Sequence, residues 1–151
     1  MKNDISRLKL YLLAAIICAL PLDVLSKDSK AATHWNQFRG PKGDGTNASS
    51  NLPIEFSGTK NIRWRTAIHD LGWSSPVVWG SQIWLTTART DGSELFAVCV
   101  DLKSGRVLHD IRVFEVNRAQ TEHGNLNTHA TPTPVIEEGR IYVHFGTYGT
   151  A

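Results

Sequence analysis

The side chains best suited to chemistry lie in a polar stretch from 115 to 130, which contains His123 and His129. Asn125 and Asn127 stand beside them, so the stretch offers imidazole and amide groups that could contact a ligand or a partner. Five residues separate the histidines, which is not a recognised metal spacing, and no cysteine or carboxylate pair completes a site. We favour a solvated loop, and contact with a ligand or a partner stays open as the alternative.

Four other residues are candidates for function, and each has a simpler structural interpretation. Trp73 and Ser74 precede a short apolar strand and could face a ligand, although a role in the turn that leads into the strand is favoured. His144 alternates with apolar neighbours, which favours a packed or edge histidine over a functional one. Cys99 lies within an apolar run, where burial would raise its thiol pKa and make it unreactive.

The glycine-rich loop from Gly40 to Gly45 lacks the features of a binding loop. It has no Gly-Lys-Ser/Thr ending and no helix after it, so it is not a phosphate loop. The oxygen ligands of Asp44 to Asn47 are too few for a calcium loop. The tripeptide Asn47-Ala48-Ser49 fits an N-glycosylation acceptor, a short pattern whose meaning depends on the host. We therefore assign no catalytic, cofactor-binding or metal-binding residue in this chain.

The leader, positions 1–32, differs in composition from the rest of the chain. It opens with three basic side chains, Lys2, Arg7 and Lys9. An apolar run from Leu10 to Leu20 follows and is interrupted by Pro21 and Asp23, so it is too short for a membrane span and is typical of a secretory signal peptide. An uncleaved anchor stays open as the alternative. We expect residues 1–32 to be removed, leaving an exported periplasmic or extracellular protein without a stable membrane span.

The remaining chain is long enough for one small domain. Cys99 is its only cysteine, so it cannot form an internal disulfide. The net charge of +2 includes the basic residues of the leader, and the rest has no basic run. Strong electrostatic binding to nucleic acid is therefore excluded.

Alternating and apolar segments after the leader predict strands. Residues 33–60 form an irregular segment rich in glycine, asparagine and serine, and residues 61–68 alternate as a half-buried strand would. Further strands are expected at the four segments 75–78, 82–87, 95–100 and 106–114, separated by tight turns. The run at 95–100 is continuously apolar, as in a strand covered on both faces. No segment has a convincing helical period, so we expect an all-β protein.

The expected architecture follows from an internal sequence repeat without gaps (the echo). Pro76-Val77-Val78 recurs as Pro134-Val135-Ile136, and Ile83-Trp84-Leu85 recurs at the same offset as Ile141-Tyr142-Val143. A fixed period indicates stacked repeats, and four antiparallel strands per repeat fit a propeller blade. We expect an incomplete β-propeller of about one and a half blades across 61–151. Blade one covers 75–114, an insertion 115–130, and the start of blade two 131–151.

The turn between the third and fourth strands of the first repeat carries a recognisable motif. Asp101 can accept backbone hydrogen bonds, Ser104 can add one, and Gly105 supplies the positive φ at which the chain reverses. The segment resembles the tryptophan-docking repeat of pyrroloquinoline-quinone-type β-propellers, whose pattern is Ala-x-Asp-x-x-Thr-Gly-x-x-x-Trp. Cys99 replaces the alanine and His109 replaces the tryptophan, so one contact between blades is built differently here. Other segments resemble the same superfamily: Trp35-x-x-Phe38-Arg39-Gly40-Pro41, Gly43-Asp44-Gly45, Leu52-Pro53, Trp64, Gly72-Trp73-Ser74-Ser75-Pro76-Val77-Val78 and His144-Phe145-Gly146-Thr147-Tyr148-Gly149.

The resemblance implies a function class. The superfamily includes quinoprotein dehydrogenases, the scaffold lipoprotein of outer-membrane protein assembly and many exported proteins of unknown role. It implies that residues 62–68 form the outer strand of a closing blade whose partners come from the far end of a longer protein. We expect a non-catalytic binding or scaffold module for a protein or cell-envelope component, and the N-terminal part of a pyrroloquinoline-quinone-dependent oxidoreductase is the alternative. Pyrroloquinoline quinone would then belong to the longer parent, and no cofactor is expected in this fragment.

Overall fold

The computed structural model describes residues 34–49, 52–117 and 127–151. Their regular elements are β1 (His34–Trp35), β2 (Val77–Trp79), β3 (Gln82–Ala88), β4 (Glu94–Asp101), β5 (Val107–Glu115), β6 (Val135–Glu137), β7 (Arg140–Tyr142) and the 3-10 helix η1 (Gly146–Tyr148). The strands pair in antiparallel sheets, so the all-β prediction is confirmed. None of the helices in this part of the chain is long and apolar enough to cross a bilayer. The expected signal peptide, residues 1–32, lies outside the described residues.

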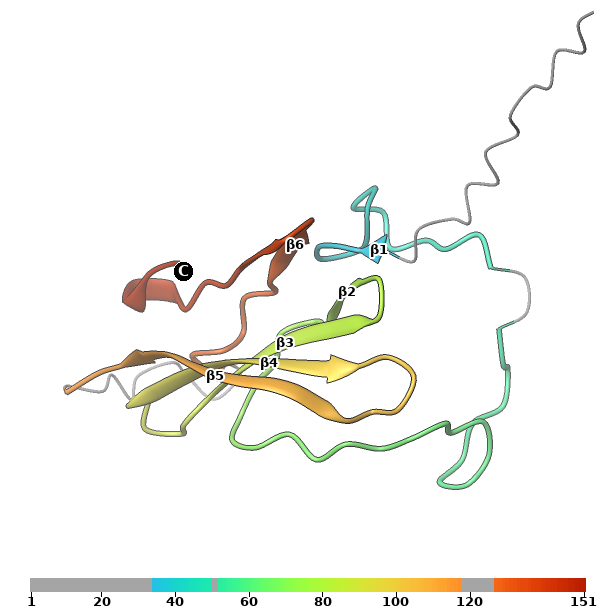
Figure 1. The fold of residues 1–151 in the computed structure, drawn as a ribbon, viewed down its shortest axis with the longest axis horizontal. Coiled ribbons are helices and arrows are strands. Elements are labelled where there is room, and N and C mark those ends of the chain that lie inside the picture. The colour runs from blue at the N-terminus through green and yellow to red at the C-terminus, as the bar shows by residue number, and fades with distance from the viewer. Residues whose placement is uncertain (1–33, 50–51, 118–126) are drawn as a thin grey trace, which may run out of the picture. The chain divides into compact units, whose positions relative to one another are not determined.

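A five-stranded antiparallel sheet contains the first repeat (Figure 1). The strand order is β1-β2-β3-β4-β5, so β2 to β5 form a meander in which each strand pairs with the next one along the chain. All four strands predicted within 75–114 therefore form. The predicted irregular segment 33–60 needs one correction, because β1 pairs with β2 and puts His34 opposite Trp79. A ladder this short leaves no pattern in the sequence.

The second repeat begins with the hairpin β6–β7, whose register reproduces that of β2–β3. In the first hairpin Val77 pairs with Trp84 and Val78 with Ile83. In the second hairpin the partners are Val135 with Tyr142 and Ile136 with Ile141. Each pair is shifted from its counterpart by the offset of the sequence echo, so the echo corresponds to a structural repeat.

The turns of these two hairpins use glycine at different positions. Gly80, the first residue after β2, has φ of +59°, whereas Gly139, the second residue after β6, has φ of +75°. Both conformations lie in the left-handed region that residues with a Cβ rarely adopt. The register is therefore preserved between the repeats although the backbone of the turn is not.

The buried core joins the sheet to the second repeat. It consists of Val77, Trp84, Ala88, Leu95, Ala97, Cys99, Ala130, Ile136, Val143 and Phe145. Strand β4, which pairs with β3 and β5, is covered on both faces, as the continuous apolar run predicts. Ala97 and Cys99 belong to the cluster on one face, and Phe96 contacts the ring of His69 on the other. Burial of this apolar surface is the main favourable contribution to folding.

The strand predicted at 61–68 does not form. Its alternation is present, because Trp64, Thr66 and Ile68 are half-buried and their neighbours are exposed. However, no backbone–backbone hydrogen bond among the described residues involves positions 61–70. A strand is defined by backbone hydrogen bonds to a partner strand. The alternation in the sequence indicates only which side chains point toward the rest of the protein. The segment is extended and half-buried, but it has no ladder.

Candidate functional site

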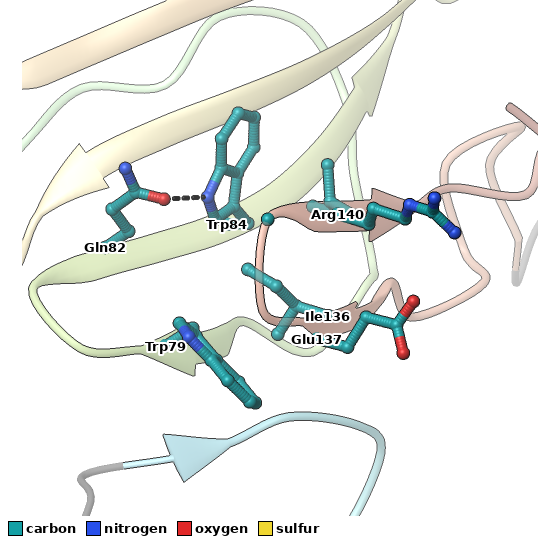
Figure 2. Close-up of a pocket in the computed structure, with 8 residues that line it drawn as sticks. Trp79, Gln82, Trp84, Ile136, Glu137 and Arg140 are labelled. Atoms are coloured by element: carbon teal, nitrogen blue, oxygen red, sulfur yellow. Dashed lines mark hydrogen bonds between the residues drawn. The ribbon is translucent and has the colours of Figure 1, made fainter.

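A slot of about 260 Å³ opens between the two equivalent hairpins (Figure 2). Its lining residues are Trp79, Gln82, Trp84, Ile136, Glu137, Gly139, Arg140 and Ile141. β2 and β3 supply the aromatic wall, and β6 and β7 supply the aliphatic one. The volume is slightly below the range of drug-sized ligand pockets, so the slot suits one ring or one large side chain.

The indole of Trp79 is held in place from one side. β1 pairs with β2 so that His34 lies opposite Trp79, and the two rings stack with centroids 3.7 Å apart and planes 15° apart. A flat apolar group can be held by dispersion against a ring fixed in this way. The short strand β1 is therefore positioned to support the slot.

The second indole, Trp84, is buried and fixed by two neighbours. Its Nε1 donates a hydrogen bond of 3.0 Å to Oε1 of Gln82. The ring stacks on His109 from β5, with centroids 5.8 Å apart and planes 13° apart. His109 on β5 therefore packs against Trp84 within the same sheet.

The charged groups lie at the rim of the slot. Oε1 of Glu137 accepts a hydrogen bond of 2.7 Å from the hydroxyl of Tyr142. In Figure 2 the charged ends of Glu137 and Arg140 extend away from the two indole rings. The slot therefore has a mainly apolar interior and a mixed-charge rim, an arrangement suited to holding a group.

The loops that lead into the two repeats are joined by hydrogen bonds at equivalent positions. Ser75 N donates to Oγ1 of Thr133, its counterpart in the second repeat, at 3.1 Å. Trp73 N and Ser74 N both donate to the carbonyl of Ala130 at 3.1 Å. These bonds fix the two repeats to each other at this end.

Trp73 and Ser74 have different environments. Oγ of Ser74 accepts a hydrogen bond of 3.0 Å from Thr86 N, so its predicted role in the turn is confirmed. The side chain of Trp73 is 59% exposed, although its backbone is fixed to Ala130. The structure leaves Trp73 available for contact and gives Ser74 a structural role.

The candidate histidines do not form a common site among the described residues. The ring of His129 is half-buried and makes an edge contact with Tyr148, with centroids 5.2 Å apart. His144 is exposed and its Nδ1 lies 2.9 Å from Oγ1 of Thr150, as expected for an edge histidine. His123 lies outside the described residues.

The solvated-loop prediction for 115–130 is wrong at the C-terminal end of that stretch. Thr128 and Ala130 are buried, at 8% and 0% exposure. The reason is the carbonyl of Ala130, which accepts the hydrogen bonds that join the two repeats. A polar composition cannot reveal that a distant turn needs this acceptor.

Cys99 is buried at 0% exposure, and this burial raises the pKa of its thiol to about 11. A rise from 9.0 to about 11 reduces the thiolate fraction roughly 100-fold at neutral pH. We expect the peptide that contains Cys99 to react with iodoacetamide at pH 8 at least about 100-fold more slowly in the folded protein than in urea. Mass spectrometry of that peptide measures this directly, and equal rates in the two states would show that the thiol is accessible.

The turn motif is formed as expected. Oδ1 of Asp101 accepts hydrogen bonds from the backbone N and from Oγ of Ser104, at 2.7 and 2.6 Å. These bonds lower the pKa of Asp101. Gly105 has φ of +73°, so its predicted left-handed conformation is confirmed. The motif is a structural turn.

Sequence reasoning missed a cluster around His69. Its Nδ1 lies 2.6 Å from Oδ2 of Asp70, and its Nε2 lies 3.0 Å from Oδ1 of Asp110 on β5. These hydrogen bonds raise the pKa of His69. The adjacent His69-Asp70 pair was the only sequence signal, because Asp110 is 41 residues away. Within the described ranges no group of three His, Cys, Asp or Glu side chains is arranged to hold a metal ion.

No family model, curated protein or solved structure matches this chain.

Proposed function

We propose that this chain is an exported β-propeller protein that acts as a binding or scaffold module for another protein or a cell-envelope component. The observation that supports it most is the identical strand register of β2–β3 and β6–β7 at the offset of the sequence echo. Equivalent hairpins that pack on one another through a shared core are what consecutive repeats of a stacked architecture would produce. In this proposal β2 and β6 begin successive blades.

The unpaired segment 62–68 supports the same architecture. It is extended and half-buried on one face, and among the described residues its backbone forms no ladder. Such a backbone edge is a template for pairing with further strands. We propose that it is the outer strand of a closing blade whose other strands come from elsewhere in a longer protein.

The slot between the repeats is the proposed contact point. Its two indoles are supported from behind by His34 and His109, and aromatic side chains in rigid settings often contribute much of the energy at binding surfaces. The charged rim of Glu137 and Arg140 would orient a macromolecular partner. The slot is small, so it would accept one anchoring side chain of that partner.

A crosslinking experiment in cells that export the full chain tests this function. A photoreactive amino acid replaces Glu137 at the rim, and the same amino acid at exposed Phe56 is the control. We expect one discrete adduct with an envelope component from position 137 and not from position 56. Loss of that adduct in a Trp79→Ala background would place the contact at the slot. Identical adducts from both positions, or none, would contradict the proposal.

A cofactor titration separates this function from the oxidoreductase alternative. Pyrroloquinoline quinone with calcium is added to the purified full-length form, in which the alternative places the cofactor pocket, and retained quinone absorbance is measured after gel filtration. We expect no retained absorbance. Stoichiometric retention would overturn the non-catalytic proposal.

A further inference from the structure

The extended segment 61–70 is attached to the sheet through side chains. Nε1 of Trp64 donates a hydrogen bond of 3.1 Å to the carbonyl of Leu102, and the hydroxyl of Thr66 donates to the carbonyl of Gly105. The backbone of the segment makes no hydrogen bond to the sheet among the described residues. Leu71, the residue directly after the segment, pairs with Ala88 of β3 through two backbone hydrogen bonds and anchors the chain there. How closely positions 61–70 stay against the sheet therefore depends on a few side-chain contacts.

At its C-terminal end the segment is attached through His69. Both ring nitrogens of His69 face carboxylates, with Asp70 on the same segment and Asp110 on β5. The ring edge also contacts the face of Phe96 on β4, with centroids 4.8 Å apart and planes 90° apart. Only an imidazolium can donate from both nitrogens at once, so this geometry fits the protonated ring.

Arg112 lies beside Phe96 and is already paired with carboxylates. Arg112, which lies opposite Phe96 in the β4–β5 ladder, forms ion pairs with Glu94 and Glu115. Phe96 itself carries no charge. Asp70 and Asp110 are therefore the carboxylates whose interaction with the His69 ring depends on its charge.

We propose that the Asp70–His69–Asp110 cluster is a pH-sensitive latch that holds segment 61–70 against β4 and β5. While His69 is protonated it bridges the segment to β5 through two charge-assisted hydrogen bonds. When it loses its proton it can donate from one nitrogen only, and one carboxylate then faces a lone pair. Release of the latch leaves the hydrogen bonds of Trp64 and Thr66 as the side-chain attachments of 62–68, so pH controls how easily that backbone edge detaches from the sheet.

The direction of the pH effect follows from the raised pKa of His69. A group whose pKa is higher in the folded state contributes stability that is fully present below its unfolded value of 6.5 and is lost as pH rises through the folded value. The latch is therefore closed at pH 6 and weakens above the raised pKa. Salt weakens it too, since the cluster is partly exposed.

Limited trypsin digestion of the full chain tests the latch. Arg63 and Arg65 are exposed on the segment, so detachment increases cleavage after them. The cleavage rate of His69→Gln is divided by that of wild type at pH 6 and again at pH 9. Because both rates in each ratio are measured at the same pH, the pH dependence of trypsin cancels. We expect cleavage several-fold slower in wild type at pH 6, and a ratio near one at pH 9. His144→Gln, which alters another exposed histidine, should match wild type at both pH values.

An NMR titration of wild type provides a second measurement, which reports the protonation of His69 directly. The imidazole signal of His69, assigned by its absence in His69→Gln, should titrate above 6.5. Asp110→Asn should lower that pKa. A His69 pKa at or below 6.5, or a cleavage ratio that is the same at both pH values, would overturn the proposal.

Discussion

Gly105→Ala is expected to lower the free energy of unfolding by about 3 kcal/mol. Gly105 has φ of +73°, a conformation that costs about 1–2 kcal/mol for a residue with a Cβ. The added Cβ would also lie 2.6 Å from Cδ2 of Trp64, closer than side chains tolerate. The indole cannot easily move, because its Nε1 is hydrogen-bonded to Leu102 O. Urea unfolding of the full chain, followed by circular dichroism, measures the loss.

Gly139→Ala is the matched control for this prediction. Gly139 has a similar φ of +75°, but no atom lies within 4 Å of the position that its Cβ would occupy. We expect a loss of about 1 kcal/mol from the backbone alone. In a Trp64→Ala background the cost of Gly105→Ala should fall to the same value. Equal costs at both glycines in the wild-type background would show that Trp64 does not press on the turn.

Phe145→Ala is expected to lower the free energy of unfolding by about 3–5 kcal/mol. Phe145 follows β7, is 2% exposed and belongs to the core that joins the two repeats. Its ring makes an edge contact with Phe114 on β5, with centroids 6.0 Å apart and planes 84° apart. Truncation removes this apolar contact and leaves a cavity between the sheet and the second repeat. Thermal and urea unfolding of the full chain measure the effect.

The control for this prediction is Phe56→Ala, which removes the same side chain from a site that is 68% exposed. We expect a loss below about 0.5 kcal/mol there. A small effect at Phe145 would mean that the second repeat does not depend on the sheet for stability. In that case the shared core would not link the repeats as described.

The strands of the first repeat could be predicted because their signals are local. Apolar alternation and turn residues such as Gly80 and Gly105 act over a few positions, and the hairpins form where those signals indicated. The internal echo predicted the start of a second repeat, and the register of β6–β7, which matches that of β2–β3, agrees with it. For the same reason the burial of Cys99 followed from its apolar neighbours alone.

The slot could not be predicted, because it lies between two hairpins that are far apart in the sequence. Trp84 was predicted within a strand and Trp79 just after one, but nothing local indicated that Ile136 and Arg140 would line the same slot. The support that His34 gives to Trp79 depends on the very short ladder between β1 and β2. Long-range packing of this kind has no signature in a single sequence.

The all-β class, the repeat and the conformation of the turns depend on side-chain period and on the φ preferences of a few residues, so they could be predicted from the amino-acid sequence. Which backbone groups have hydrogen-bond partners depends instead on how distant parts of the chain pack. Segment 61–68 has the alternation of a strand but lacks a ladder, and Ala130 is buried in a polar stretch because the distant turn at Trp73 and Ser74 donates to it. His69 meets Asp110 for the same reason, since hydrogen bonds between distant residues depend on how the chain packs.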